Sequence, residues 1–149
     1  MNHMKIYRIM VGLLVLLGLA GCKSSPLTIT FKENTCTSSG PTKFSDKKFT
    51  LVLVIDAKEH NGYGLGIYTL AKGKTLEDLK SLGFGATQPD WATLVLAFGP
   101  HTSGTYTYTV DPYQNTVYQG EPLYFICVYR DTEVQATTFG YLGSVEVKK

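Results

Sequence analysis

The stretch LYFICVYRDTEVQATTFGYLGSVEVKK, residues 123–149, closes the chain. It contains an apolar run that includes Cys127, then a polar loop, and then a segment in which apolar and polar residues alternate. Alternation with a period of two, and short apolar runs rich in Val, Ile, Tyr and Phe, are typical of β-strands. This end of the chain therefore predicts two strands, at 122–129 and 143–148, with a cysteine inside the first.

The same strand pattern recurs toward the N-terminus. Turn signals rich in Gly, Asn and Pro, such as NGYG and DPYQN, lie between several of the strand segments. About seven short strands at this spacing favour an antiparallel all-β sandwich over alternating strands and helices. The five further segments are 27–31, 48–57, 64–70, 91–98 and 104–110.

One segment, GKTLEDLKSLGFG at 73–85, has a helical pattern instead. Thr75 can cap a helix, and Asp78 lies where a carboxylate can return a hydrogen bond to the cap. Gly83 tolerates the left-handed conformation that ends many helices. A helix over about 76–82 is therefore expected against an end or open edge of the sandwich, with its apolar stripe formed by Leu76, Leu79 and Leu82.

The N-terminus, MNHMKIYRIMVGLLVLLGLAGC, has Lys5 and Arg8 ahead of a short apolar run. Such a segment is typical of a signal peptide, and its last four residues resemble a bacterial lipobox that ends at Cys22. The pattern predicts a signal peptide at 1–21, and the resemblance implies a lipidated Cys22 with a short tether at 22–26. The remaining residues, 27–149, are enough for one domain. The protein is then expected outside the cytoplasm, anchored by lipid to the cell membrane or the outer membrane. A plain secretory signal is the alternative.

The charge of the chain argues against nucleic acid as a partner. The formal net charge is +2, with 14 basic and 12 acidic residues, and two of the basic residues lie in the signal segment. The remaining chain is close to neutral, whereas a nucleic-acid-binding face needs an excess of Lys and Arg.

Three cysteines are present, and Cys22 is assigned to lipid. An exported chain with two remaining cysteines favours a Cys36–Cys127 disulfide. The alternative is a pair of buried free thiols that behave as small apolar side chains.

From about Leu27 onward the chain resembles small secreted bacterial proteins with a cupredoxin-like fold. The segments that carry the resemblance are CTSSGP, GLGIYTLAKGKTLEDL, QPDWATLVLAFGP, LYFICVY and GYLGSVEVK. The resemblance implies a cupredoxin-like Greek-key sandwich. It does not by itself imply an activity, because function depends on the site rather than on the fold.

A type 1 copper site requires a thiolate, two imidazoles and usually an axial thioether. By the resemblance, His60 and Cys127 are the candidate ligands. No His follows Cys127, Tyr141 lies where blue-copper proteins often carry Met, and all three Met residues precede Cys22. The sequence therefore predicts no metal and no other cofactor. A copper carrier or chaperone with a non-standard site at His60 and Cys127 is the alternative.

Tyrosines are the remaining candidates for a binding surface. Tyr106 and Tyr108 alternate with Thr on one predicted strand, and Tyr113 and Tyr118 follow it. Aromatic side chains of this kind can stack on a sugar, a peptide or a protein, although Tyr and Thr also suit any strand surface or a core-facing side. No nucleophile motif accompanies His60 or His101. The sequence thus predicts a non-enzymatic binding or scaffolding module of the cell envelope, with an unknown protein or glycan partner.

Overall fold

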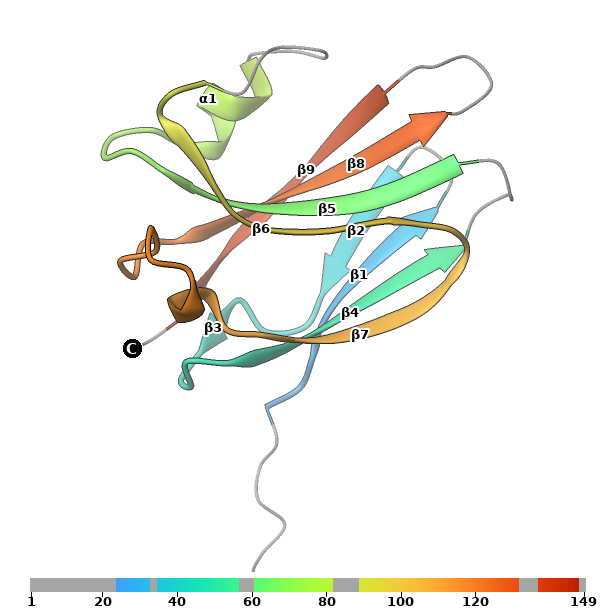
Figure 1. Cartoon of the computed structure of the whole chain (residues 1–149), viewed down its shortest axis with the longest axis horizontal. Coiled ribbons are helices and arrows are strands. Elements are labelled where there is room, and N and C mark those ends of the chain that lie inside the picture. The colour runs from blue at the N-terminus through green and yellow to red at the C-terminus, as the bar shows by residue number, and fades with distance from the viewer. Residues whose placement is uncertain (1–23, 33–34, 57–60, 82–88, 132–136, 148–149) are drawn as a thin grey trace, which may run out of the picture.

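The computed structural model describes residues 24–32, 35–56, 61–81, 89–131 and 137–147. They form an all-β sandwich of two sheets with one short α-helix at one end (Figure 1). The fold class predicted from the sequence, an all-β sandwich with a short helix, is confirmed. No helix in these ranges has the length and apolar character needed to cross a membrane.

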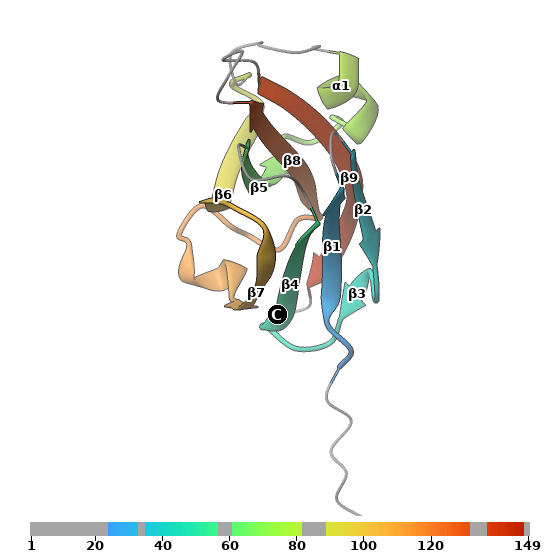
Figure 2. The ribbon, with the colours of Figure 1, turned by 90° about the vertical axis from the view of Figure 1, so that its right-hand side faces the viewer.

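The four-stranded sheet presents one buried and one outward face. In β1 and β4 every second side chain is buried, because successive residues of a strand point to opposite sides. Ile29, Leu51 and Leu53 on the inner face are 0% exposed. Figure 2 shows the strands side by side in the order β2 (Thr35–Ser39), β1 (Leu27–Lys32), β4 (Phe49–Asp56) and β7 (Gly104–Val110).

The five-stranded sheet supplies the other half of the core. Its inward residues include Leu65, Ile67 and Phe125, each of which is at most 2% exposed. They meet the inner face of the four-stranded sheet in one apolar cluster, and burial of this surface is the main stabilising contribution to the fold. The strand order is β3 (Lys43–Phe44), β9 (Thr137–Val147), β8 (Leu123–Asp131), β5 (Asn61–Leu70) and β6 (Ala92–His101).

Two features of the sheets differ from the sequence prediction. Strands β2 and β3 were missed, because TCTSS and the dipeptide KF lack the alternation of apolar residues that identifies a strand. The sandwich is also not wholly antiparallel, since β1 pairs with β4 and β3 pairs with β9 in parallel. The chain leaves the four-stranded sheet after β2, adds β3 to the other sheet and returns as β4, which brings β1 and β4 together in the same direction.

Helix α1 (Leu76–Ser81) lies at one end of the molecule, on the outer side of the five-stranded sheet (Figure 1). Leu79 is buried in a second apolar cluster with Leu70, Ala92 and Ile126. The predicted cap is confirmed: the Thr75 N–H and hydroxyl donate to Asp78 Oδ2 at 2.8 and 2.9 Å, and the Asp78 N–H donates back to Thr75 Oγ1 at 3.3 Å. Leu82 and Gly83, predicted in the stripe and at the helix end, lie outside the described residues.

Because of the Thr75–Asp78 cap, the stability of helix α1 should depend on pH. Hydrogen bonds from the Thr75 backbone and hydroxyl hold the pKa of the Asp78 carboxyl below its ordinary value. A depressed folded-state pKa contributes stability above the unfolded pKa, and this contribution is lost as the pH falls through the folded pKa. Trp91, the single Trp of the chain, packs on the cluster that holds α1, so its fluorescence should show helix undocking below about pH 3.8.

Asp78→Asn should remove this acid step, because the amide does not titrate. Glu77→Gln is the matched control, since Glu77 lies in the same turn and bonds Lys80 instead of the cap. Identical acid profiles for the wild-type protein and Asp78→Asn would show that another carboxyl controls the helix.

Candidate functional site

The Cys36–Cys127 disulfide joins the two sheets. Cys36 lies on β2, an edge strand of the four-stranded sheet, and Cys127 lies on β8 inside the five-stranded sheet. Their Cα atoms are 6.5 Å apart and 91 residues apart in the sequence. The predicted pairing is confirmed, and Cys127 is 4% exposed within the core.

The disulfide also prevents Cys127 from acting as a ligand in a type 1 copper site. A bonded sulfur is not a thiolate, and the thiolate is the ligand that a type 1 copper site requires. The described residues include no group of three His, Cys, Asp or Glu side chains placed to hold a metal ion. The candidate residue His60, the side chain of Tyr141 and the lipidation residue Cys22 lie outside the part of the chain described.

Tyr106 and Tyr108 lie on the core-facing side of β7, at the open edge of the sandwich. Both are half-buried, whereas Thr105, Thr107 and Thr109, which alternate with them, are exposed. The Tyr106 ring stacks on His101 with a centroid distance of 4.2 Å. The Tyr108 hydroxyl and His101 Nε2 are 2.6 Å apart, and the Phe98 ring lies 4.6 Å from that of Tyr108. These rings close the edge between β6 and β7, so the structure gives Tyr106 and Tyr108 a packing role and leaves each partly accessible.

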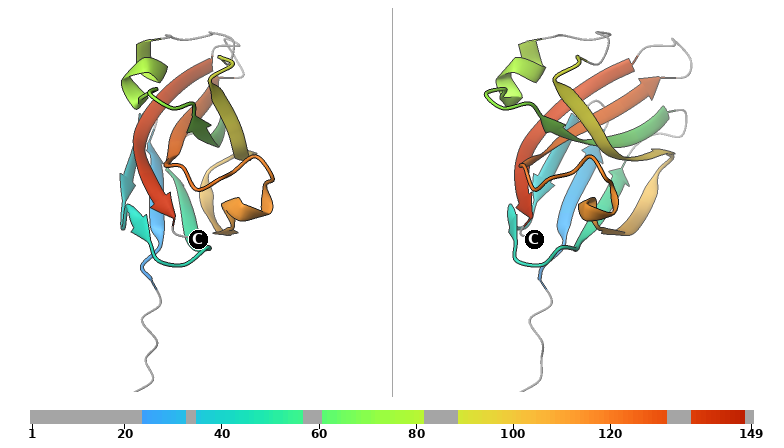
Figure 3. Two further views of the ribbon diagram at one scale, coloured as in Figure 1. Left: turned by 90° about the vertical axis from the view of Figure 1, so that its left-hand side faces the viewer. Right: turned by 60° about the vertical axis from the view of Figure 1, so that its left-hand side comes forward.

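The structure corrects the prediction for Tyr118. Its side chain is 4% exposed within the core and cannot form a binding surface. Burial raises the pKa of the Tyr118 hydroxyl, and the neighbouring Tyr113 and Glu121 add to the shift. Tyr113 packs edge-on against Tyr118 and donates a hydrogen bond to the Val147 carbonyl at 3.2 Å. This bond links the connection between β7 and β8, drawn in orange in Figure 3, to the end of β9. The four tyrosines therefore do not form one exposed face.

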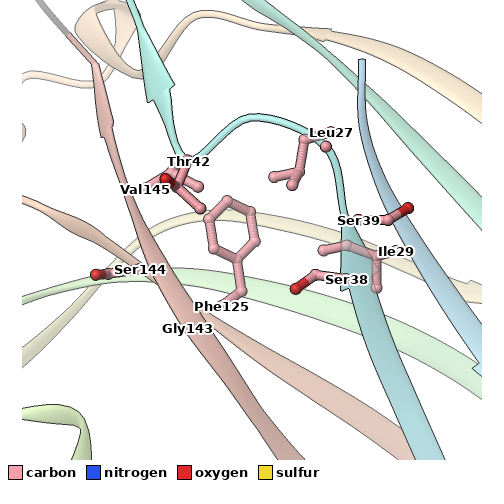
Figure 4. A pocket seen from close by; sticks show the side chains of 10 residues that line it. Leu27, Ile29, Ser38, Ser39, Thr42, Phe125, Gly143, Ser144 and Val145 are labelled. Atoms are coloured by element: carbon pink, nitrogen blue, oxygen red, sulfur yellow. The ribbon is translucent and has the colours of Figure 1, made fainter. Parts of the chain in front are cut away.

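A cavity of about 130 Å³ lies at the opposite edge of the sandwich, between β2 and β9. Its apolar walls are four core residues that are at most 3% exposed: Leu27, Ile29, Phe125 and Val145. Figure 4 shows the Phe125 ring in the centre, with Val145 and Thr42 on one side of it and Leu27, Ile29 and Ser38 on the other. The remaining lining residues are Ser39, Gly40, Gly143 and Ser144.

The lining defines what the cavity can accept. None of its ten residues carries a charge. An apolar cavity of roughly 150 Å³ in another protein holds one benzene molecule, so this cavity suits a group of about that size. The hydroxyl groups of Ser38 and Thr42, both exposed and both part of the lining, can hydrogen-bond to a neutral polar group at one end of such a ligand.

Gly143 leaves open space beside the cavity. It is one of the lining residues and lies on β9 at a break in the register between β8 and β9. A Cβ built at this position has no atom within 4 Å. The sequence did not indicate this cavity, because its walls come from β1, β2, β8 and β9, and two of its serines lie on a strand that has no apolar pattern.

The sheets, the disulfide and the cavity define a small all-β sandwich domain with covalently joined sheets and an apolar site at one open edge. No family model and no curated protein matches the chain. Among solved structures it is similar to Na-dithionite reduced auracyanin from the photosynthetic bacterium Roseiflexus castenholzii, at 12% sequence identity and a TM-score of 0.37. The match covers 82% of this chain and 95% of auracyanin, and no ligand or activity is transferred from it.

Proposed function

We propose that this protein is a lipid-anchored binding module of the cell envelope, with a cupredoxin-like domain that binds a small neutral ligand and performs no chemistry on it. The lipobox-like residues that end at Cys22 support the anchor. The Cys36–Cys127 disulfide supports a role other than type 1 copper binding. The observation that carries the binding role is the cavity between β2 and β9.

The lining chemistry indicates the class of ligand. Apolar walls favour a ring or a branched chain, because burial of such a group removes its apolar surface from water. A carboxylate or ammonium is disfavoured, because no lining residue carries an opposite charge to offset its desolvation. A neutral ring with one hydroxyl matches both the walls and the opening, so phenol is a suitable probe.

Phenol should bind the wild-type protein, benzene should bind more weakly, and benzoate should not bind. The reason is that phenol fills the cavity and also meets the hydroxyls at its opening. Two-dimensional NMR titration of the full chain would measure this, with the expected shifts confined to resonances of residues such as Ile29, Phe125 and Val145.

Gly143→Ile should abolish these shifts, because the new side chain enters the space that the ligand occupies. Thr93→Ile is the matched control: it adds the same side chain at an exposed position on β6 and should leave phenol binding unchanged. Equal phenol shifts in wild-type protein and Gly143→Ile, or shifts spread over the whole domain, would contradict the proposed site.

The anchor has its own test. Cys22→Ala should move the protein from the membrane fraction into the soluble fraction, because no acyl chain can then be attached. Cell fractionation with metabolic labelling by palmitate would measure both the position and the lipid. Lys23→Ala is the neighbouring control and should stay with the membrane. Retention of Cys22→Ala in the membrane without label would refute the anchor and leave the ligand site untouched.

A further inference from the structure

The outward face of the four-stranded sheet is rich in threonine and nearly free of charge. Its outer strands β2 and β7 present exposed side chains, and those of the central strands β1 and β4 are half-buried apart from their last residues. The thirteen residues of this face are Thr28, Thr30, Lys32, Thr35, Thr37, Ser39, Thr50, Val52, Val54, Asp56, Thr105, Thr107 and Thr109. We call this set the threonine face.

The register arranges these side chains in rows across the sheet. Thr30 pairs with Thr37 on one side and with Val54 on the other, and Val54 pairs with Thr105. The next row contains Ser39, Thr28, Val52 and Thr107. Short β-branched side chains in level rows produce a surface that another sheet can approach closely.

The two charges of the threonine face lie in a single row. Lys32 is the last residue of β1 and Asp56 the last of β4, and the two are register partners because the strands run parallel. Both are exposed. Both also lie on the central strands of the sheet, on either side of its midline.

The positions of Lys32 and Asp56 make the threonine face complementary to the same face of a second copy. A two-fold axis parallel to the strands and above the midline places β1 of one copy over β4 of the other. Lys32 of each copy then lies over Asp56 of its partner, while Thr28 lies over Val52 and Thr30 over Val54. The same operation leaves the starts of both β1 strands at one end of the pair, which suits two chains anchored in one membrane if the proposed anchor is correct.

We propose that the threonine face packs against the threonine face of a second copy of this chain. The partner is a second copy because the face supplies both members of the charge pair in the positions that two-fold symmetry requires. Four strands about 4.8 Å apart and about 20 Å long present roughly 400 Å² per copy. This area lies below the usual size of a stable interface, so the dimer is weak in solution. Confinement to a membrane raises the effective concentration and favours it.

Charge exchange tests the pairing. Lys32→Glu and Asp56→Lys should each weaken the dimer by about tenfold or more, because each places like charges opposite one another. The combined variant Lys32→Glu, Asp56→Lys should restore wild-type association, since it exchanges the two charges and keeps their attraction. Lys47→Glu, which makes the same change in an exposed loop off the face, is the control and should associate as wild type. The measurement is sedimentation velocity of the purified full chain over a concentration series, in density-matched detergent.

A second variant distinguishes contact between two threonine faces from hydrogen bonding between the edge strands of two copies. Thr30→Arg introduces a large charged side chain at a central strand and should abolish association, whereas pairing through the free edge of β7 would survive it. The proposal is overturned by three results: a wild-type chain that stays monomeric at millimolar concentration, single charge variants that match Lys47→Glu, or a combined variant that fails to restore association.

Discussion

Reduction of the Cys36–Cys127 disulfide should lower the free energy of unfolding by about 4 kcal/mol. The bridge closes a loop with a sequence separation of 91 residues, and in the chain-entropy model a cross-link across a loop of this length removes about 4–5 kcal/mol of conformational entropy from the unfolded chain. For a domain of this size the loss corresponds to a fall in Tm on the order of 15 °C. The cause lies in the unfolded chain, in which the bridge keeps Cys36 and Cys127 together.

Chemical denaturation with and without a reductant would measure the effect. Cys36→Ala is the control, since reductant should not change its stability and its own loss should be close to that of the reduced wild type. A reduced protein that unfolds at the same denaturant concentration as the oxidised one would contradict the prediction. It would mean that β2 and β8 stay together in the unfolded state without the bond.

Phe125→Ala should lower the free energy of unfolding by about 3–5 kcal/mol. The ring is 2% exposed and lies between the two sheets beside the existing cavity (Figure 4). Its removal forfeits the burial of a large apolar group and enlarges a space that the neighbouring strands cannot close, because the disulfide holds β2 and β8 in place. Thr93→Ala, an exposed change, should alter stability by less than about 0.5 kcal/mol.

Ligand binding provides a second measurement on the Phe125→Ala variant. Because the enlarged space is apolar, benzene should stabilise Phe125→Ala more than the wild-type protein. Thermal unfolding with and without benzene would test this. If Phe125→Ala loses less than about 1 kcal/mol in free energy of unfolding and benzene does not change its Tm, the sheets move together to fill the space of the missing ring.

Local sequence patterns predicted most of the fold. Alternation of buried residues in β1 and β4 follows from the strand period of two, and the Thr75–Asp78 cap follows from side chains three residues apart. Strand pairing is different, because it depends on contacts between distant segments. The parallel pair of β1 with β4 and the short strands β2 and β3 were therefore not predictable from local pattern.

Less of the candidate site than of the fold could be predicted from the sequence. The disulfide was predicted from cysteine count and export, which require no geometry. The tyrosines lie close in the sequence, which favours a single group, yet Tyr118 is buried while Tyr106 and Tyr108 close a sandwich edge beside His101. The cavity and the threonine face arise from strand register and sheet order, so no single segment carries a signal for either.

The disulfide has a mechanical consequence. A protein tethered to a membrane near its N-terminus and pulled at its C-terminus carries the tension along the shortest covalent path. That path passes from β1 and Cys36 directly to Cys127 and β9, and it bypasses β4, β5, β6, β7 and the helix. Under load only the segments before Cys36 and after Cys127 can be pulled out, and the enclosed segment, which contains most of the strands, cannot be extended until the bond is reduced.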